Sequence, residues 1–93
     1  VVTLGPDANL FTALAARENG CTVKETSTPY QAAEVIKEHM RDNALILCKG
    51  SQNCVFAEET VKQLLANPED SAKLVRQSPF WLKIKDKHFK DSM

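Results

Sequence analysis

The chain has 93 residues, of which 43% are hydrophobic and 26% are charged, and its formal net charge is zero. This length predicts one small domain, and the composition is typical of a soluble globular protein. The neutral balance of charge argues against a nucleic-acid or membrane-surface partner, and no apolar stretch approaches the ~20 residues of a membrane-spanning helix. The N-terminal residues lack a signal-peptide pattern, so we expect a cytoplasmic protein.

The first quarter of the chain predicts a strand, a helix and a second strand. Residues 1–4 form an apolar strand pattern, and Asp7 in the following turn is a candidate N-cap for a helix over residues 8–18. Gly20 ends that helix, and residues 21–25 predict a short second strand. Because the chain opens directly on a strand pattern, we expect it to be cut from a longer protein.

The middle of the chain repeats this alternation. Thr28 is a helix cap, Pro29 occupies the first helical position, and Gln31 can reach back as in a capping box. Residues 44–48 are the most apolar run, which predicts a central strand of a parallel sheet. A helix over residues 55–66 follows.

The last quarter predicts helices only. Pro68 follows a capping asparagine and opens a helix that ends near Gln77, and Pro79 opens another. The order β-α-β-α-β-α with a helical tail predicts a Rossmann-like, three-layer α/β fold around a small parallel sheet. We therefore divide the chain into a domain of residues 1–67 and a helical C-terminal extension of residues 68–93.

The expected final helix interleaves basic residues with aromatic and apolar ones. Because the chain has no net charge, an amphipathic helix explains this pattern better than a nucleic-acid patch does. Its lysines would extend their charged ends into solvent, and its aromatic side would dock on the sheet or on a partner. The basic residues are Lys83, Lys85, Lys87, His88 and Lys90, and their neighbours are Trp81, Ile84 and Phe89.

A polar loop follows the expected third strand, where ligands bind in open α/β sheets. Lys49 offers a positive charge, Gly50 permits close backbone approach, and Ser51, Gln52 and Asn53 offer hydrogen-bonding groups. The loop suits an anion such as a carboxylate or phosphate, and we take these residues as the candidate substrate-binding site. It matches neither the P-loop nor the dinucleotide-binding pattern, so by spacing alone an ordinary polar turn explains it better.

Other reactive residues have simpler explanations. Glu58 and Glu59 could form a carboxylate pair, but acidic residues in a first helical turn usually stabilise the helix dipole, and at least one should face solvent. Cys54 could be a nucleophile at a helix N-terminus, but no histidine or arginine lies near it in sequence. We expect no catalytic residues in this chain.

The cysteines and histidines do not predict a metal site. Cys21, Cys48 and Cys54 lack metal-type spacing, and His39 and His88 are far apart in sequence. Reduced, mostly structural thiols are the better interpretation, with Cys48 packed as a small hydrophobe inside the expected strand.

Residues 42–51, with Glu58, Glu59 and Val61 after them, resemble the C-terminal domain of Mur ligases. The most similar type adds a D-Ala-D-Ala dipeptide to UDP-MurNAc-tripeptide. This family typically shows an aspartate, an apolar strand, a Lys-Gly-Ser-Arg turn and a helix with paired glutamates and valines. The resemblance extends over about residues 1–65, because the strand and helix near the N-terminus follow the same order.

The resemblance implies a cytoplasmic enzyme of peptidoglycan biosynthesis. In such ligases this domain closes over a central ATPase domain and helps to position the nucleotide and the incoming amino acid or dipeptide. The whole enzyme uses ATP and Mg²⁺ to make an acyl phosphate, which an amine attacks to form an amide. Lys49, Gly50 and Ser51 would line the cleft that faces the added substrate.

The chain also departs from this family. Gln52 and Asn53 replace the arginine after Gly-Ser, with an apparent one-residue insertion, so a bidentate carboxylate ligand is lost. No P-loop or central domain is present, and the tail from Pro68 exceeds the usual family ending. We therefore expect no bound cofactor and no ATP hydrolysis by this chain alone. ATP and Mg²⁺ are implied for the parent enzyme, with its central ATPase domain and UDP-MurNAc-peptide as partners.

Two other functions fit the sequence. One is a stand-alone, flavodoxin-like module that binds a small anion in the same crevice, and the other is an interaction domain whose helix around Trp81 contacts a partner. Complete strands flanking the sheet would favour the stand-alone module. A bare apolar sheet edge would favour a piece of a longer enzyme.

Overall fold

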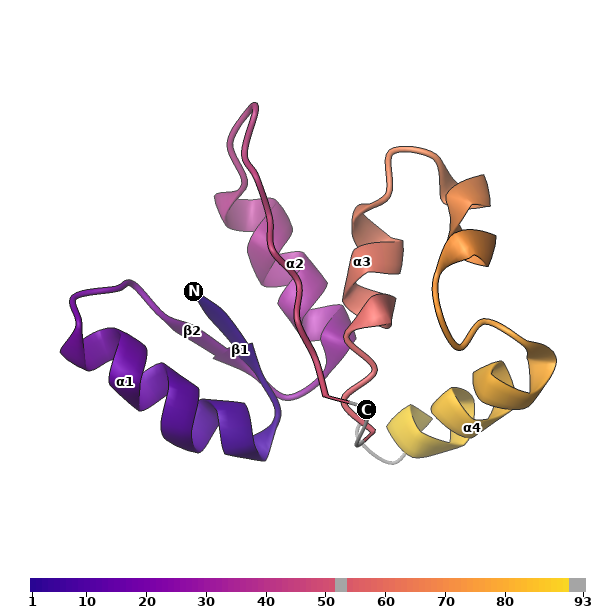
Figure 1. Cartoon of the computed structure of the whole chain (residues 1–93), viewed down its shortest axis with the longest axis horizontal. Coiled ribbons are helices and arrows are strands. Elements are labelled where there is room, and N and C mark those ends of the chain that lie inside the picture. The colour runs from indigo at the N-terminus through magenta and orange to yellow at the C-terminus, as the bar shows by residue number, and fades with distance from the viewer. Residues whose placement is uncertain (52–53, 91–93) are drawn as a thin grey trace.

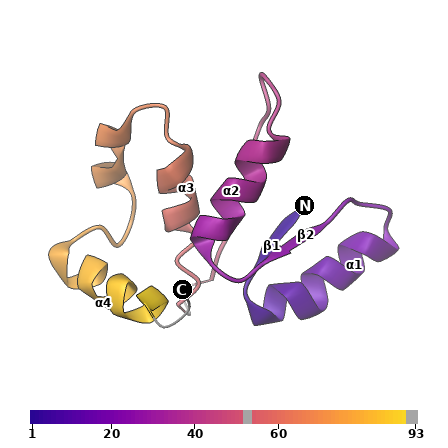
Figure 2. The same ribbon diagram turned by 180° about the vertical axis from the view of Figure 1, so that it is seen from behind.

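The computed structural model describes residues 1–51 and 54–90 and is mostly helical (Figure 1). Figures 1 and 2 agree that α1 and the two strands form one end of the molecule, that α3 and α4 form the other, and that α2 lies between them. In chain order the elements are β1 (Val2–Leu4), the π-helical turn η1 (Ala8–Thr12), α1 (Ala13–Glu18), β2 (Lys24–Thr26), α2 (Pro29–His39), α3 (Glu58–Leu64), the 3₁₀ turn η2 (Pro68–Lys73) and α4 (Pro79–Lys90).

The sheet of the described residues has two short parallel strands, with Val2 opposite Lys24 and Leu4 opposite Thr26. The buried Thr26 hydroxyl donates to the Thr3 carbonyl at 2.8 Å, so a side chain reinforces the backbone ladder. The helical stretch η1–α1 connects the strands, as the alternating pattern predicted. The strand over residues 21–25 was placed too early, because β2 begins at Lys24.

The beginning of α2 confirms the capping prediction. The Gln31 N–H donates to Thr28 Oγ1 at 3.1 Å, and the Gln31 side chain accepts from the Ser27 N–H at 2.9 Å. Pro29 has no N–H to leave unpaired at this first helical position. The predicted Asp7 cap was wrong, because the Asp7 backbone is itself helical and its side chain makes no capping bond.

The predicted third strand was wrong. Residues 44–48 form no strand, and the side chains of Leu45 and Leu47 are 99% and 91% exposed. The Ala44 N–H donates to the Arg41 carbonyl at 3.1 Å, in a turn that sends the chain back alongside α2 (Figure 1). The apolar run therefore passes β1 without pairing with it.

This difference overturns the predicted fold class. The residues that the structure describes form two short parallel strands with helices, and not a Rossmann-like, three-layer fold around a three-stranded sheet. An apolar run of strand length indicates only that the segment could be buried in a sheet. Whether it pairs depends on packing against strands that are distant in sequence.

The packed centre lies away from the sheet, where α2, the residues before α3, and α4 meet. The centre of the Phe89 ring lies 5.3 Å from the centre of the Tyr30 ring and 5.9 Å from that of the Phe56 ring, and both pairs have edge-to-face geometry. The Thr60 hydroxyl donates to the Pro29 carbonyl at 2.8 Å and joins α3 to α2. The aromatic side of α4 therefore docks on α2 and on the residues before α3, and not on the sheet.

The boundaries of α3 and of the turn after Asn67 differ modestly from the predicted ones. The Asn67 side chain accepts from the Glu69 N–H at 3.1 Å, as its position before Pro68 predicted, but the turn that follows is 3₁₀. The helix expected over residues 55–66 is shorter at both ends, as the bounds of α3 show. Within the described part of the chain, every helix is too short or too polar to cross a membrane.

Candidate functional site

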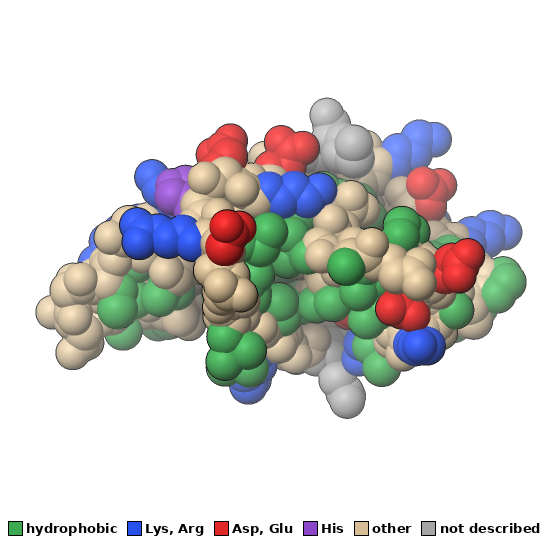
Figure 3. Space-filling model, turned by 90° about the horizontal axis from the view of Figure 1, so that it is seen from above, with side chains coloured by type: hydrophobic (Ala, Val, Ile, Leu, Met, Phe, Trp, Pro, Cys, Tyr) green, Lys and Arg blue, Asp and Glu red, His purple; other side chains and the backbone are tan. Residues whose placement is uncertain are grey.

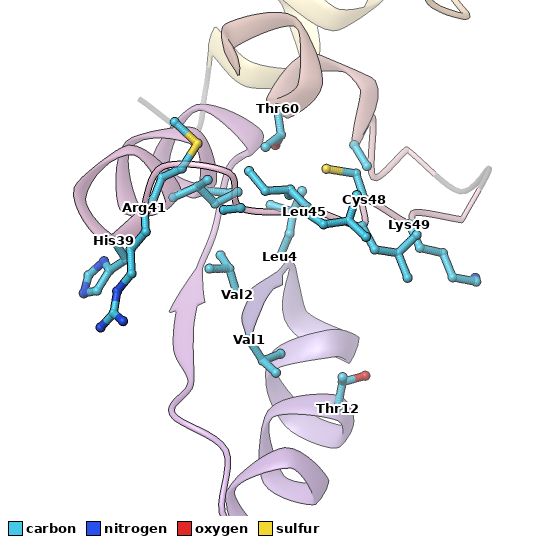
Figure 4. A pocket seen from close by; sticks show the side chains of 17 residues that line it. Val1, Val2, Leu4, Thr12, His39, Arg41, Leu45, Cys48, Lys49 and Thr60 are labelled. Atoms are coloured by element: carbon cyan, nitrogen blue, oxygen red, sulfur yellow. The ribbon is translucent and has the colours of Figure 1, made fainter. Parts of the chain in front are cut away.

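The predicted loop joins the exposed apolar run to α3, so it does not lie at the end of a strand. Lys49 lies at one wall of a large groove, and its side chain extends away from that groove (Figure 4). Gly50 and Ser51 line a separate, smaller pocket of about 170 Å³. Gln52 and Asn53 lie outside the described residues.

Gly50 approaches the residue before α3 so closely that no side chain fits. A Cβ atom at position 50 would lie 2.6 Å from the Ala57 Cβ atom, well inside van der Waals contact. Gly50 was predicted to permit the close approach of a ligand, whereas the close contact seen here is with the chain itself. Gly50 therefore holds the loop against the start of α3.

Arg76 enters the same small pocket from the C-terminal extension. Its guanidinium lies 5.9 Å from the centre of the Trp81 ring, and its Nη1 atom lies 3.5 Å from Glu58 Oε1. Sequence reasoning missed this residue, since Arg76 is 25 positions beyond Ser51 and belongs to no motif. The full lining of the pocket is Cys48, Gly50, Ser51, Ala57, Glu58, Val61, Val75 and Arg76.

A buried ammonium group anchors one side of this pocket. Lys85 is 2% exposed, and its Nζ atom lies 2.9 Å from Glu59 Oε2 and 3.1 Å from Glu58 Oε1. It also donates to the Arg76 carbonyl at 2.7 Å. This single side chain from α4 thus connects both glutamates of α3 to the segment that carries Arg76.

Both glutamates face inward, so the expectation that one would face solvent was wrong. Their side chains are 8% and 6% exposed, because Lys85 on α4 covers them. Glu58 Oε1 accepts no hydrogen bond from the described residues, and the charges of Lys85 and Arg76 stabilise it instead. The lysine expected to extend into solvent therefore lies inside the molecule.

Among the described residues, Glu59, unlike Glu58, accepts hydrogen bonds from neighbouring side chains. Burial by itself raises the pKa of Glu59, but hydrogen bonds from Gln77 and Lys85 and the charges of Lys85 and Lys62 outweigh it. The pKa of this carboxyl group is therefore below its usual value. Gln77 Nε2 donates to Glu59 Oε2 at 2.9 Å, and Gln77 Oε1 accepts from Lys62 Nζ at 3.0 Å.

A second cavity, of about 750 Å³, lies between β1, the C-terminal half of α2 and the exposed apolar run (Figure 4). Val2 and Leu4 line it from the strand, and Leu45 lines it from the apolar run. Its lining is mainly apolar, so it differs in character from the charged pocket at Gly50. The two cavities share Cys48 and Ala57 as neighbours.

The cysteines carry free thiols and are all exposed. Cys48 was predicted to be packed inside a strand, and that was wrong because the strand does not form. Among the residues that the structure describes, no group of three or more histidine, cysteine or acidic side chains could hold a metal ion.

Comparison of the chain with protein-family models, with curated proteins and with solved structures returned no match. The resemblance to Mur ligases therefore depends on the sequence pattern of residues 42–51, Glu58, Glu59 and Val61.

Proposed function

We propose that this chain is the C-terminal, substrate-positioning domain of an ATP-dependent, amide-forming ligase of the Mur type, acting in the cytoplasm on peptidoglycan precursors. The small pocket beside Gly50 and Ser51 binds the carboxylate of the incoming amino acid or dipeptide. This chain alone hydrolyses no ATP, because the nucleotide and Mg²⁺ belong to the central domain of the parent enzyme.

The observation that carries the proposal is the presence of Arg76 in the pocket formed by Gly50 and Ser51. The family has an arginine directly after Gly-Ser, and this chain has Gln52 there. Arg76 supplies a guanidinium to the same loop from a different element. A guanidinium can bind a carboxylate through two parallel hydrogen bonds, which a lysine cannot do.

The geometry around Arg76 supports this role. The Arg76 side chain is 22% exposed, so it is accessible from solvent while Trp81 supports it from one side. Its contact with Glu58 is 3.5 Å long, and Glu58 also has Lys85 at 3.1 Å. A ligand carboxylate can therefore attract the guanidinium without leaving Glu58 unpaired.

The size of the pocket also limits what it binds. About 170 Å³ is room for roughly six water molecules, which suits one carboxylate group and a small side chain. A nucleotide is much larger. The pocket thus fits the end of an amino acid or a dipeptide.

The test is a titration of the purified chain with D-Ala-D-Ala, followed by NMR. We expect shifts of the Gly50 and Ser51 amides and of the Arg76 side chain. The C-terminal amide of the same dipeptide, which has no carboxylate, should cause none. Arg76→Lys should weaken the response strongly, whereas the control Arg41→Ala, at the rim of the large groove, should keep it.

Two results would contradict the proposal. Equal shifts with the dipeptide and its amide would show that no carboxylate is recognised. A response to inorganic phosphate, with none to the dipeptide, would instead favour the stand-alone anion-binding module.

A further inference from the structure

The apolar run at residues 44–48 is exposed to an unusual degree. Leu45 and Leu47 are 99% and 91% exposed, and Ile46 between them is 38% exposed. Isolated exposed leucines are common on protein surfaces, but consecutive ones in an extended segment usually contact another chain or another element. We call residues 44–48 the apolar segment.

The strand beside this segment has one unpaired edge. Lys24 N–H donates to the Val1 carbonyl and Gly5 N–H donates to the Thr26 carbonyl, so the odd-numbered residues of this strand direct their backbone groups toward β2. Backbone groups alternate in direction along a strand, which means that those of Val2 and Leu4 point to the opposite edge. No strand among the described residues pairs with that edge.

The unpaired edge and the apolar segment both line the large groove. Val2, Leu4 and Leu45 all line this cavity of about 750 Å³, and Figure 4 shows the residues of β1 on the same side of the segment that carries Leu45. The space-filling view from above shows hydrophobic side chains at several places across this face, with charged side chains between them (Figure 3). An extended peptide laid in the groove would bury apolar side chains and pair with β1.

The total exposed surface is larger than a chain of this mass requires. A folded monomer of 10.4 kDa exposes about 5,400 Å² by the usual scaling, whereas this chain exposes 7094 Å². The radius of gyration is 13.7 Å, against about 12.3 Å for a compact domain of this length. The excess of about 1,700 Å² exceeds the ~800 Å² that each partner buries in a standard interface.

We propose that two copies of this chain form a symmetric dimer, in which the apolar segment of each copy lies in the large groove of the other and pairs with its β1 edge. Each copy carries both the segment and the groove, so a two-fold arrangement satisfies both at once. The net charge of zero means that two copies do not repel each other. Leu45 and Leu47 line the groove and not the pocket at Gly50 and Arg76, so variants at these two positions test the dimer separately from the proposed function.

Burial in the groove of a second copy explains the exposed position of Leu45 and Leu47 better than burial in their own groove does. Leu45 and Leu47 border their own groove but remain almost fully exposed, so they bury almost no apolar surface within their own chain. Addition of a strand to an exposed sheet edge is a common mode of association, with backbone bonds giving affinity and alternate side chains giving specificity.

The first experiment measures the mass of the purified chain in solution by sedimentation and light scattering. We expect twice the 10.4 kDa of one chain, falling twofold in a double variant with Leu45→Asp and Leu47→Asp. The matched control is Phe80→Asp on α4, which places the same charge at another exposed apolar position and should leave the dimer intact. Circular dichroism checks that each variant keeps its helices.

The second experiment does not depend on variants. In a mixture of isotope-labelled and unlabelled copies, filtered NMR spectra should show contacts from the Leu45 and Leu47 methyl groups to those of Val2 and Leu4 in the other copy. The amides of Val2 and Leu4 should also exchange slowly with solvent in the dimer.

Three results would overturn the dimer. The first is a wild-type chain that stays monomeric at all concentrations. If the Val2 and Leu4 amides exchange slowly in that monomer, the chain's own apolar segment covers the edge of β1. A double variant that still dimerises would place the interface elsewhere. Open-ended assemblies would contradict the closed symmetry.

Discussion

The ammonium group of Lys85 lies 2.9 Å from the carboxylate of Glu59, although the residues are 26 positions apart in the chain. This ion pair is buried and joins the C-terminal extension to the first turn of α3. It also holds Arg76, through its carbonyl, beside the loop that contains Gly50 and Ser51. The candidate pocket therefore depends on a charge that belongs to neither the loop nor the pocket.

Replacement of Lys85 by methionine should destabilise the fold strongly. The methionine keeps much of the volume but leaves the carboxylates of Glu58 and Glu59 buried without their main counter-charge, a loss of about 3–5 kcal/mol. Urea unfolding measures the effect. The control is Lys83→Met on the exposed side of the same helix, which should change the free energy of unfolding by less than about 0.5 kcal/mol. Equal midpoints for the two variants would contradict this prediction.

The stability of the chain should fall in acid, in part through Glu59. Its pKa is lower in the folded state than the usual 4.5, so the folded state binds this proton more weakly than the unfolded state does. The resulting stabilisation is complete well above pH 4.5 and is lost as pH falls through the folded-state pKa. Urea unfolding at a series of pH values should show a smaller decline below pH 4.5 for Glu59→Gln than for the wild type. Parallel curves would show that Glu59 contributes nothing to the acid sensitivity.

Gly50→Ala should be destabilising because the new methyl group would lie 2.6 Å from the Ala57 Cβ atom. Overpacking of this kind typically costs about 1–3 kcal/mol. Ala57→Gly removes the Cβ atom that the new methyl group would clash with. The double variant should therefore lose less free energy of unfolding than the sum of the two single variants. A double-mutant cycle from urea unfolding measures this coupling. If the two changes are simply additive, the loop does not approach α3 at this point.

Thr28→Ala should weaken the start of α2. The Thr28 hydroxyl accepts the Gln31 N–H, and loss of such a cap costs about 1 kcal/mol. Ser27→Ala is the matched control, because Ser27 contributes its backbone N–H to Gln31. Thermal unfolding should separate the two variants, and a loss as large in Ser27→Ala would show that Thr28 is not the effective cap.

Sequence reasoning succeeded where the deciding hydrogen bonds lie within a few residues. The caps at Thr28 and Asn67 formed as predicted, and Gly20 adopts the positive φ of 83° that ends the first helix. The sequence did not predict that Gly50 lies against Ala57, because this contact depends on how the loop folds back on the start of α3. Arg76 was missed because its place beside the loop comes from the fold of the extension.

The sequence by itself determined where α2, η2 and α4 begin, because capping side chains and prolines act on backbone groups in their own turn. Only the tertiary structure decided that residues 44–48 remain outside the sheet and that Lys85 is buried. Both outcomes depend on groups far away along the chain. A strand needs a neighbouring edge to pair with, and a buried charge needs opposite charges brought to it. Neither requirement can be read from a local pattern of residues.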